Sequence, residues 1–166
     1  LVDPTSDYVK AMVSSLNRAK DDVIIGSFGG FSRSTTGNIL LPTKQKIAVG
    51  GTGLTKAKII QARKLFRQNE ADNHNGEELC ITYSAQAAAD ILADPTLTSA
   101  DYMAGKFLES GDVEGKWMGF TWIPSERTPL SGGVRLLYAW AKSGVTLGKG
   151  ADITTKVGED PGKGFN

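Results

Sequence analysis

The stretch "DPTSDYVKAMVSSLNRAKDDVII", residues 3 to 25, decides what kind of fold this chain can adopt. Its apolar residues recur at steps of three and four, which predicts one apolar stripe along an amphipathic helix: Val9, Met12, Leu16, Ala19 and Val23. Capping side chains, a proline and an acid mark its start: Asp3, Thr5 or Ser6, then Pro4 and Asp7.

The predicted helix is long for a chain of 166 residues. From Thr5 to Ile25 it would span roughly 30 Å at 1.5 Å per residue, and we expect Gly26, Gly29 and Gly30 to end it. Little else in the sequence is available to pack against such a helix. We therefore expect it to be continuous and only partly covered by its own chain.

The segment after this helix is rich in Gly, Ser, Thr and Asn. We expect residues 29–45, which include "GGFSRSTTGN", to form a loop, and its part from Gly29 to Gly37 to be mobile or shaped by neighbours. Further elements are expected in chain order: a short strand at Gln45–Val49, a helix at about Thr55–Gln68, a strand in "EELCITYS", a helix at about Ala85–Leu92 that ends at Asp94-Pro95, and a short helix near Ala100–Glu109.

Three strand-like runs follow. "KWMGFTWIP" is expected to present Met118, Phe120 and Trp122 on one face, and "VRLLYAWAK" to present Val134, Leu136, Tyr138 and Trp140. "DITTKVG" alternates Ile153, Thr155 and Val157 with polar residues. Trp117, Trp122 and Trp140 are interpreted as core residues. The order of helices and strands predicts the α+β class.

The composition limits the possible partners. Apolar residues make up 40% and charged residues 22%, with a net charge of +1, so no overall field attracts nucleic acid or membrane. No apolar run reaches the roughly 20 residues of a membrane-spanning helix. The one cysteine, Cys80, excludes an internal disulfide and a multi-cysteine zinc site.

The glycine-rich stretch "GGTGLTKAKII", residues 50 to 60, invites comparison with phosphate-binding loops. The Walker pattern needs lysine directly after its last glycine, but Gly53 is followed by Leu54-Thr55-Lys56. The dinucleotide pattern fails because Lys56 stands where the third glycine belongs. We interpret the stretch as a flexible turn in which Thr52 or Thr55 caps the next helix.

Other candidates for chemistry are weak, so no catalytic, cofactor-binding or metal-binding residue is predicted. The one histidine, His74, lies beside a probable turn, without the partners that a zinc site or a nucleophile would need. Asp21 and Asp22 are adjacent and point about 100° apart on a helix, so they do not form a catalytic pair. We expect them to be solvated or paired with Arg18 or Lys20, with a pair between subunits as the alternative.

One predicted helix is basic on one side. It carries no acid among its basic residues: Lys56, Lys58, Arg63, Lys64 and Arg67. Contact with nucleic acid or with a neighbouring subunit is one interpretation. A solvated face is the simpler one, since cations near a helix C-terminus are favoured by its dipole.

An ordered set of segments resembles one known family. "LVDPTSDYVKAMVSSLNRAKDDVIIGSF", "GGTGLTKAKIIQARKLF", "TSADY", "WMGFTWI", "LLYAWAKSGVTL" and "ITTKVGEDPGKGFN" are similar, in this order, to major capsid proteins of tailed bacteriophages with the Hong Kong 97-type fold. The resemblance covers nearly the whole chain. Each segment alone is weakly specific, whereas the ordered set is fairly specific.

The resemblance implies an organisation of the chain. Residues 1–30 would hold the spine helix of a peripheral domain, residues 31–147 would form an axial domain, and residues 148–166 would return to the peripheral domain. Family members also carry an N-terminal arm and an extended loop before the spine helix, and strands after the last segment. This sequence lacks those segments, so we expect it to be a fragment of a longer chain.

Two functions are compared. The resemblance implies a structural virion protein, not an enzyme, that self-assembles through hexamers and pentamers into an icosahedral shell in the phage head. It would be made in the bacterial cytoplasm, need no cofactor, and meet packaged DNA only by non-specific proximity. The alternative is a small α+β enzyme or ligand-binding module that uses the loop from Gly50 to Lys56. An enzyme should have a pocket with convergent polar groups, which a shell subunit does not need.

Overall fold

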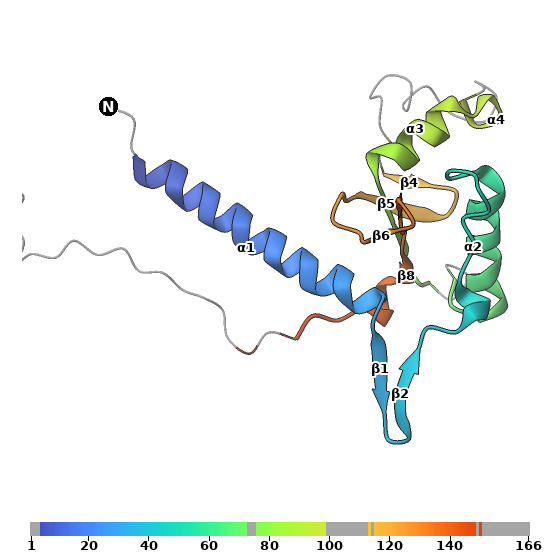
Figure 1. Cartoon of the computed structure of the whole chain (residues 1–166), viewed down its shortest axis with the longest axis horizontal. Helices are drawn as coiled ribbons and strands as arrows, with labels where there is room; N and C mark the ends of the chain where they lie inside the picture. Colours follow the sequence, from blue (N-terminus) through green and yellow to red (C-terminus); the bar gives the residue numbers. More distant parts are fainter. Residues whose placement is uncertain (1–3, 73–75, 99–112, 114, 149, 151–166) are drawn as a thin grey trace, which may run out of the picture.

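A computed structural model gives the structure of the chain and describes residues 4–72, 76–98, 113, 115–148 and 150. Figure 1 shows three parts: helix α1 (Pro4–Phe28), a hairpin of β1 (Phe31–Ser34) and β2 (Gly37–Leu40), and a compact part that begins at Thr43. Several predicted features lie outside the described residues: Asp3, His74, the helix near Ala100–Glu109 and the strand in "DITTKVG".

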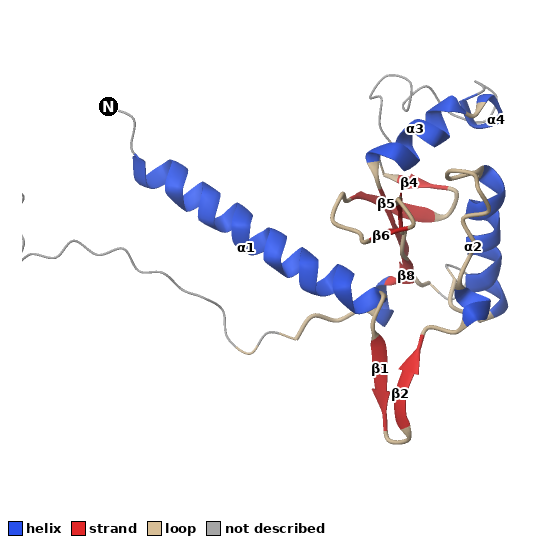
Figure 2. Cartoon of the chain, in the orientation of Figure 1, coloured by secondary structure: helices blue, strands red, loops and turns tan. Residues whose placement is uncertain are grey.

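The long first helix is confirmed. α1 runs for 25 residues, about 37 Å, and extends away from the compact part (Figure 2). The prediction that Gly26 ends the helix was wrong, because α1 continues through it to Phe28. A single glycine is tolerated inside a helix at a cost of about 1 kcal/mol. The chain leaves the helix at Gly29 and Gly30.

The segment after α1 is not a loop. β1 and β2 form an antiparallel hairpin in which Phe31 lies opposite Leu40 and Ser34 opposite Gly37. Phenylalanine and isoleucine favour strands, and Gly37, with φ of +129°, supplies the backbone conformation that the hairpin requires directly after its turn at Thr35 and Thr36. The small polar residues therefore belong to a turn and its strands. The predicted strand at Gln45–Val49 is absent, since a 3-10 helix, η1 (Thr43–Gln45), is followed by irregular chain.

The compact part contains the remaining elements. In chain order these are η1, α2 (Lys56–Gln68), β3 (Leu79–Tyr83), α3 (Ala85–Ala93), α4 (Pro95–Thr98), β4 (Lys116–Trp117), β5 (Phe120–Pro124), β6 (Leu130–Ser131), β7 (Val134–Arg135), β8 (Ala139–Ala141) and η3 (Lys142–Gly144). The predicted helices at 55–68 and 85–92 and the strand in "EELCITYS" are confirmed. Thr55 and Ser84 cap α2 and α3.

A four-stranded mixed sheet with order β4-β5-β3-β8 organises the compact part. β3 lies parallel to β5 and antiparallel to β8, and all five of its residues are buried. The core forms where α2 and α3 meet this sheet, around Ile59, Leu79, Ile91 and Phe120. Because one side of each helix faces the sheet, the apolar residues Ile59, Ala62 and Phe66 of α2 pack there.

Two of the predicted strands are each divided in two. "KWMGFTWIP" folds back on itself as β4 and β5, because Met118 and Gly119 adopt φ of +49° and +82° in a two-residue turn. Met118 therefore lies in a turn and is only partly buried, while Phe120 and Trp122 are in the core as predicted. Positive φ at both positions is the geometry of a tight hairpin turn.

"VRLLYAWAK" crosses between two sheets. β7 pairs with β6, whereas β8 joins the main sheet beside β3. The prediction that Val134, Leu136, Tyr138 and Trp140 form the apolar face was wrong. The residues that pack against the core are Leu137, Ala139 and Ala141. Tyr138 and Trp140 instead contact Phe28 at the end of α1. Of the three tryptophans, Trp122 is buried, Trp117 packs at the edge of the core, and Trp140 lies outside it.

Candidate assembly surface

The apolar stripe of α1 faces solvent. Val9 is 50% exposed, Met12 56%, Leu16 40% and Val23 64%. Among the α1 side chains whose exposure the structure describes, residues 7–28, Ile25 alone is buried. Contiguous exposed apolar residues of this kind mark an interaction surface. The prediction that α1 is only partly covered by its own chain is therefore confirmed.

Aromatic rings fix the C-terminal end of α1 to the compact part. The Phe28 ring lies 5.2 Å from that of Tyr138 and 4.9 Å from that of Trp140, measured between centroids. Ile25 is buried one turn earlier. These contacts hold one end of the helix, and the rest of α1 extends beyond them, away from the compact part (Figure 1).

An ion pair adds a second attachment. The guanidinium of Arg127 donates two hydrogen bonds to the carboxylate of Asp22. These bonds lower the pKa of Asp22 and raise that of Arg127. We expected Asp22 to be solvated or paired with Arg18 or Lys20; its partner is instead Arg127, and Arg18 donates to Ser14. Because the two partners are 105 residues apart in the sequence, no local sequence pattern could have predicted this ion pair.

The hairpin is also exposed. All eight residues of β1 and β2 are accessible, and Phe31, Ile39 and Leu40 are 52%, 52% and 66% exposed. Within the described residues neither strand pairs with a third. The sequence interpretation of residues 29–45 missed this surface, although the apolar residues before and after the turn, Phe31, Ile39 and Leu40, were a signal for it.

The glycine loop has the wrong polarity for a phosphate. Gly50 and Gly51 form a turn with φ of +62° and +70°. The ammonium of Lys58 then donates to three carbonyl oxygens, those of Val49, Thr52 and Gly53, each at 2.6 Å. A phosphate loop instead directs backbone N–H groups at its ligand. The loop's carbonyl groups therefore close around the protein's own lysine.

Gly53 has a separate, steric role in the same loop. A Cβ atom there would collide with the carboxylate of Asp90, which accepts a hydrogen bond from the Leu54 N–H at 2.8 Å. Thr55, one of the two predicted caps, accepts from the Lys58 N–H and begins α2. The loop thus joins α2 to α3 and serves the fold.

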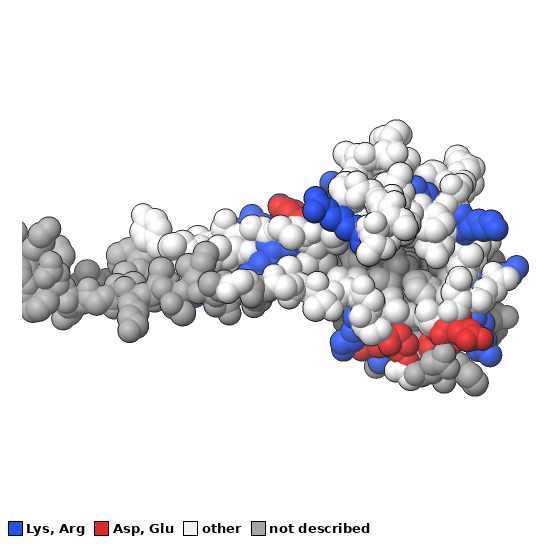
Figure 3. All heavy atoms as spheres, turned by 90° about the horizontal axis from the view of Figure 1, so that it is seen from below, with Lys and Arg blue, Asp and Glu red and all other residues white. Residues whose placement is uncertain are grey.

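The basic residues of α2 are largely used inside the compact part. Arg63 donates to the carbonyl of Gly119 at 2.9 Å, and Arg67 pairs with the buried Asp72 at 3.3 Å. Lys58 closes the glycine loop. These contacts contradict a purely solvated face. They also contradict a continuous basic patch, because three of the five cations already have partners within the chain. Figure 3 shows Lys and Arg beside Asp and Glu on one face of the compact part, so charges of both signs are mixed there.

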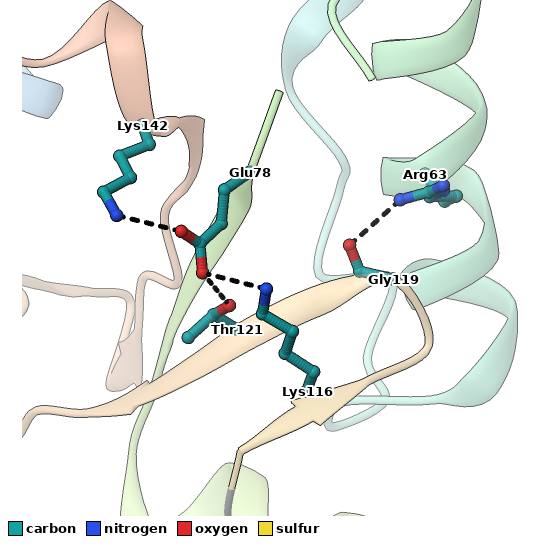
Figure 4. A network of polar contacts seen from close by, with 6 residues as sticks. All are labelled: Arg63, Glu78, Lys116, Gly119, Thr121 and Lys142. Carbon is teal, nitrogen blue, oxygen red and sulfur yellow. Dashed lines mark hydrogen bonds and ion pairs between the residues drawn. The ribbon is translucent and has the colours of Figure 1, made fainter. Parts of the chain in front are cut away.

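A charged cluster at the start of β3 was not predicted (Figure 4). Glu78 accepts from Lys142 at 2.9 Å and from the Thr121 hydroxyl at 2.9 Å, and Lys116 lies 3.4 Å away. The bonds from Lys142 and Thr121, with the two nearby ammonium groups, lower the pKa of Glu78 to about 2. Its partners come from β4, β5 and the segment after β8, so the cluster joins the strands of the sheet.

Three further observations concern other kinds of site. Within the part of the chain that the structure describes, no group of three or more His, Cys, Asp and Glu could hold a metal ion, and no helix is long and apolar enough to cross a membrane. Burial raises the pKa of the Cys80 thiol.

Comparison with known proteins identifies the class. Residues 1–164 match the family described as phage capsid protein, so the chain belongs to that family. No curated protein and no solved structure gives a significant match. The protein is thus a structural capsid protein of a bacteriophage virion, and its partners are other capsid subunits. The exposed surfaces of α1 and of the hairpin are therefore candidate sites of assembly.

Proposed function

We propose that many copies of this protein form a closed icosahedral shell, built from hexamers and pentamers, around the phage genome. The observation that carries the proposal is the exposed apolar stripe of α1 in a chain of the phage capsid family. An apolar stripe of this length is costly to expose to water at roughly 25 cal/mol per Å². Contact with other copies would bury it.

We further propose the Hong Kong 97-type fold, with residues 1–30 in a peripheral domain, residues 31–147 in an axial domain and residues 148–166 returning to the first. A single long α1 joined to a mixed α+β compact part supports this division. Contact with packaged DNA would be by non-specific proximity. Charges of both signs are mixed on the face seen in Figure 3, which does not favour a dedicated DNA-binding surface there. No observation favours the nucleotide-binding alternative, because the glycine loop is closed by Lys58.

Electron microscopy of the complete product of the gene that encodes this chain tests the proposal. We expect closed particles of uniform size. The double variant Met12→Ser/Leu16→Ser should abolish them while leaving the stability of the unassembled chain within about 0.5 kcal/mol, because exposed residues contribute little to it. Lys10→Ser, on the polar side of α1, is the matched control and should assemble normally. Failure of the native product to form particles would disprove the shell.

A nucleotide screen tests the alternative. ATP, GTP or NAD at 100 times a dissociation constant would stabilise a specific site by about 2.7 kcal/mol. We expect no thermal shift from any of them. A shift that Lys56→Ala removes would favour the enzyme instead.

A further inference from the structure

The β1–β2 hairpin exposes apolar side chains and is not part of the four-stranded sheet of the compact part. It projects away from both α1 and the four-stranded sheet (Figure 1). A two-stranded hairpin alone is marginally stable in water and needs a third strand or a packed face. Within the described residues it has neither, because its strands pair only with each other and all of their residues are exposed.

The apolar residues of the hairpin are arranged for contact. Phe31 and Leu40 lie directly opposite each other and so share one face, where they are 52% and 66% exposed. Ile39 presents a further apolar side chain on the opposite face. Cross-strand apolar pairs of this kind stabilise a sheet when a neighbour covers them. Within the part of the chain that the structure describes, no third strand covers them.

The hairpin also lacks the usual protection of free strand edges. Proteins guard such edges with charged residues or proline, but residues 31–40 contain one charge, Arg33, and no proline. The β6–β7 hairpin is a useful contrast within the same chain. Its Leu130 is 63% exposed, yet Arg135 ties it to the compact part through Glu126 at 2.7 Å and the Thr128 carbonyl at 2.7 Å.

From these observations we infer that the β1–β2 hairpin is an arm that docks on a second copy of this chain and buries Phe31 and Leu40 there. The inference rests on the proposed function, because a phage capsid protein has other capsid subunits as its partners. A single cation, Arg33, is too little positive charge for an arm that binds DNA. The free strand edges add backbone hydrogen bonds to the same contact.

Hydrogen exchange of the complete gene product, before and after assembly, tests the arm. Amides of residues 30–41 should exchange quickly in the unassembled chain and at least tenfold more slowly in particles. The double variant Phe31→Ser/Leu40→Ser should lose assembly, while its circular dichroism and thermal unfolding remain those of the native chain. The matched variant Leu130→Ser/Val134→Ser removes two exposed apolar residues from the other hairpin and should assemble normally.

The outcomes separate this inference from the proposed function. Particles in which residues 30–41 stay unprotected, or normal assembly of Phe31→Ser/Leu40→Ser, would overturn the docking arm and leave the shell intact. Equal loss of assembly in both double variants would also overturn it, because the effect would then not be specific to this hairpin. Absence of any self-association would remove the shell and the arm together.

Discussion

At the scale of single residues, Arg63 and Gly119 show how one contact depends on two kinds of constraint. The Arg63 guanidinium reaches the Gly119 carbonyl only because a glycine leaves room beside it. The same glycine adopts φ of +82° in the turn between β4 and β5. A side chain there would strain the turn and displace the arginine.

Gly119→Ala should therefore destabilise the chain by more than Gly133→Ala. Both glycines have φ near +80°, and the left-handed conformation costs alanine roughly 1–2 kcal/mol at either position. A Cβ at Gly133 meets nothing, whereas one at Gly119 collides with Arg63. Because the Arg63 guanidinium must then shift, weakening its hydrogen bond to the Gly119 carbonyl adds up to about 1.5 kcal/mol for Gly119→Ala. Urea unfolding measures both values, and equal costs would contradict this account.

Glu78 gives a prediction about pH. Its pKa is lowered from 4.5 to about 2 in the folded chain, so its contribution to stability is fully present above about pH 4.5. That contribution is lost as the pH falls toward 2. Glu78→Gln should therefore lower the free energy of unfolding at pH 7, and the difference from the native chain should shrink progressively below pH 4.5.

A double-mutant cycle checks that the partners of Glu78 carry this effect. Lys142→Gln should cost stability in the native background and less in the Glu78→Gln background, because its main partner has then been removed. A constant difference between Glu78→Gln and the native chain from pH 7 to pH 2 would mean that the carboxylate charge is not involved.

At the scale of elements, the question is what sets the direction of α1. The Asp22–Arg127 pair and the stack of Phe28 on Tyr138 and Trp140 act on its C-terminal third. Beyond them the helix exposes its apolar stripe. Its direction relative to the compact part therefore depends on a few side chains.

Removal of the ion pair should loosen α1 without unfolding it. In a Cys80→Ala background, spin labels at Ser15 and Ser143 should give a narrow distance distribution that Asp22→Asn broadens. The charge-swapped pair Asp22→Arg/Arg127→Asp should restore the narrow distribution. Asp21→Asn is the matched control and should leave it unchanged; broadening by Asp21→Asn would point to a general charge effect.

At the scale of the whole molecule, stability is unevenly distributed. β3 is buried along its whole length, between two strands, and Ile91 of α3 is fully buried against it. Most of α1 lacks such packing. A helix gains most of its stability from tertiary contacts, so an unpacked segment opens readily.

Hydrogen exchange of the unassembled chain should reveal this difference. Amides of β3 should exchange slowest, and those of residues 7–16 in α1 should exchange at least a hundredfold faster although both are regular structure. Assembly should slow the exchange of α1 and leave that of β3 nearly unchanged. Equal protection of both segments before assembly would show that α1 is already packed in the single chain.

The sequence alone determined the features whose pattern is local. The step of three and four in α1, the threonine cap of α2, predicted at Thr52 or Thr55 and found at Thr55, and the apolar run of β3 each depend on residues close in the chain. The failure of "GGTGLTK" to match a phosphate loop is local in the same way. The resemblance to phage capsid proteins also came from the sequence, and the family match confirms it.

Only the tertiary structure decided the contacts between distant residues. Asp22 finds Arg127 across 105 positions, and Arg63 finds Gly119 across 56. The division of "VRLLYAWAK" between two sheets and the reversal of its apolar face depend on where β3 lies. Helix periods and caps are set by neighbours within a turn, whereas strand pairing and ion pairs are chosen among many distant partners by packing. The choice of a distant partner depends on the packing of the whole folded chain, so it cannot be predicted from a local sequence pattern.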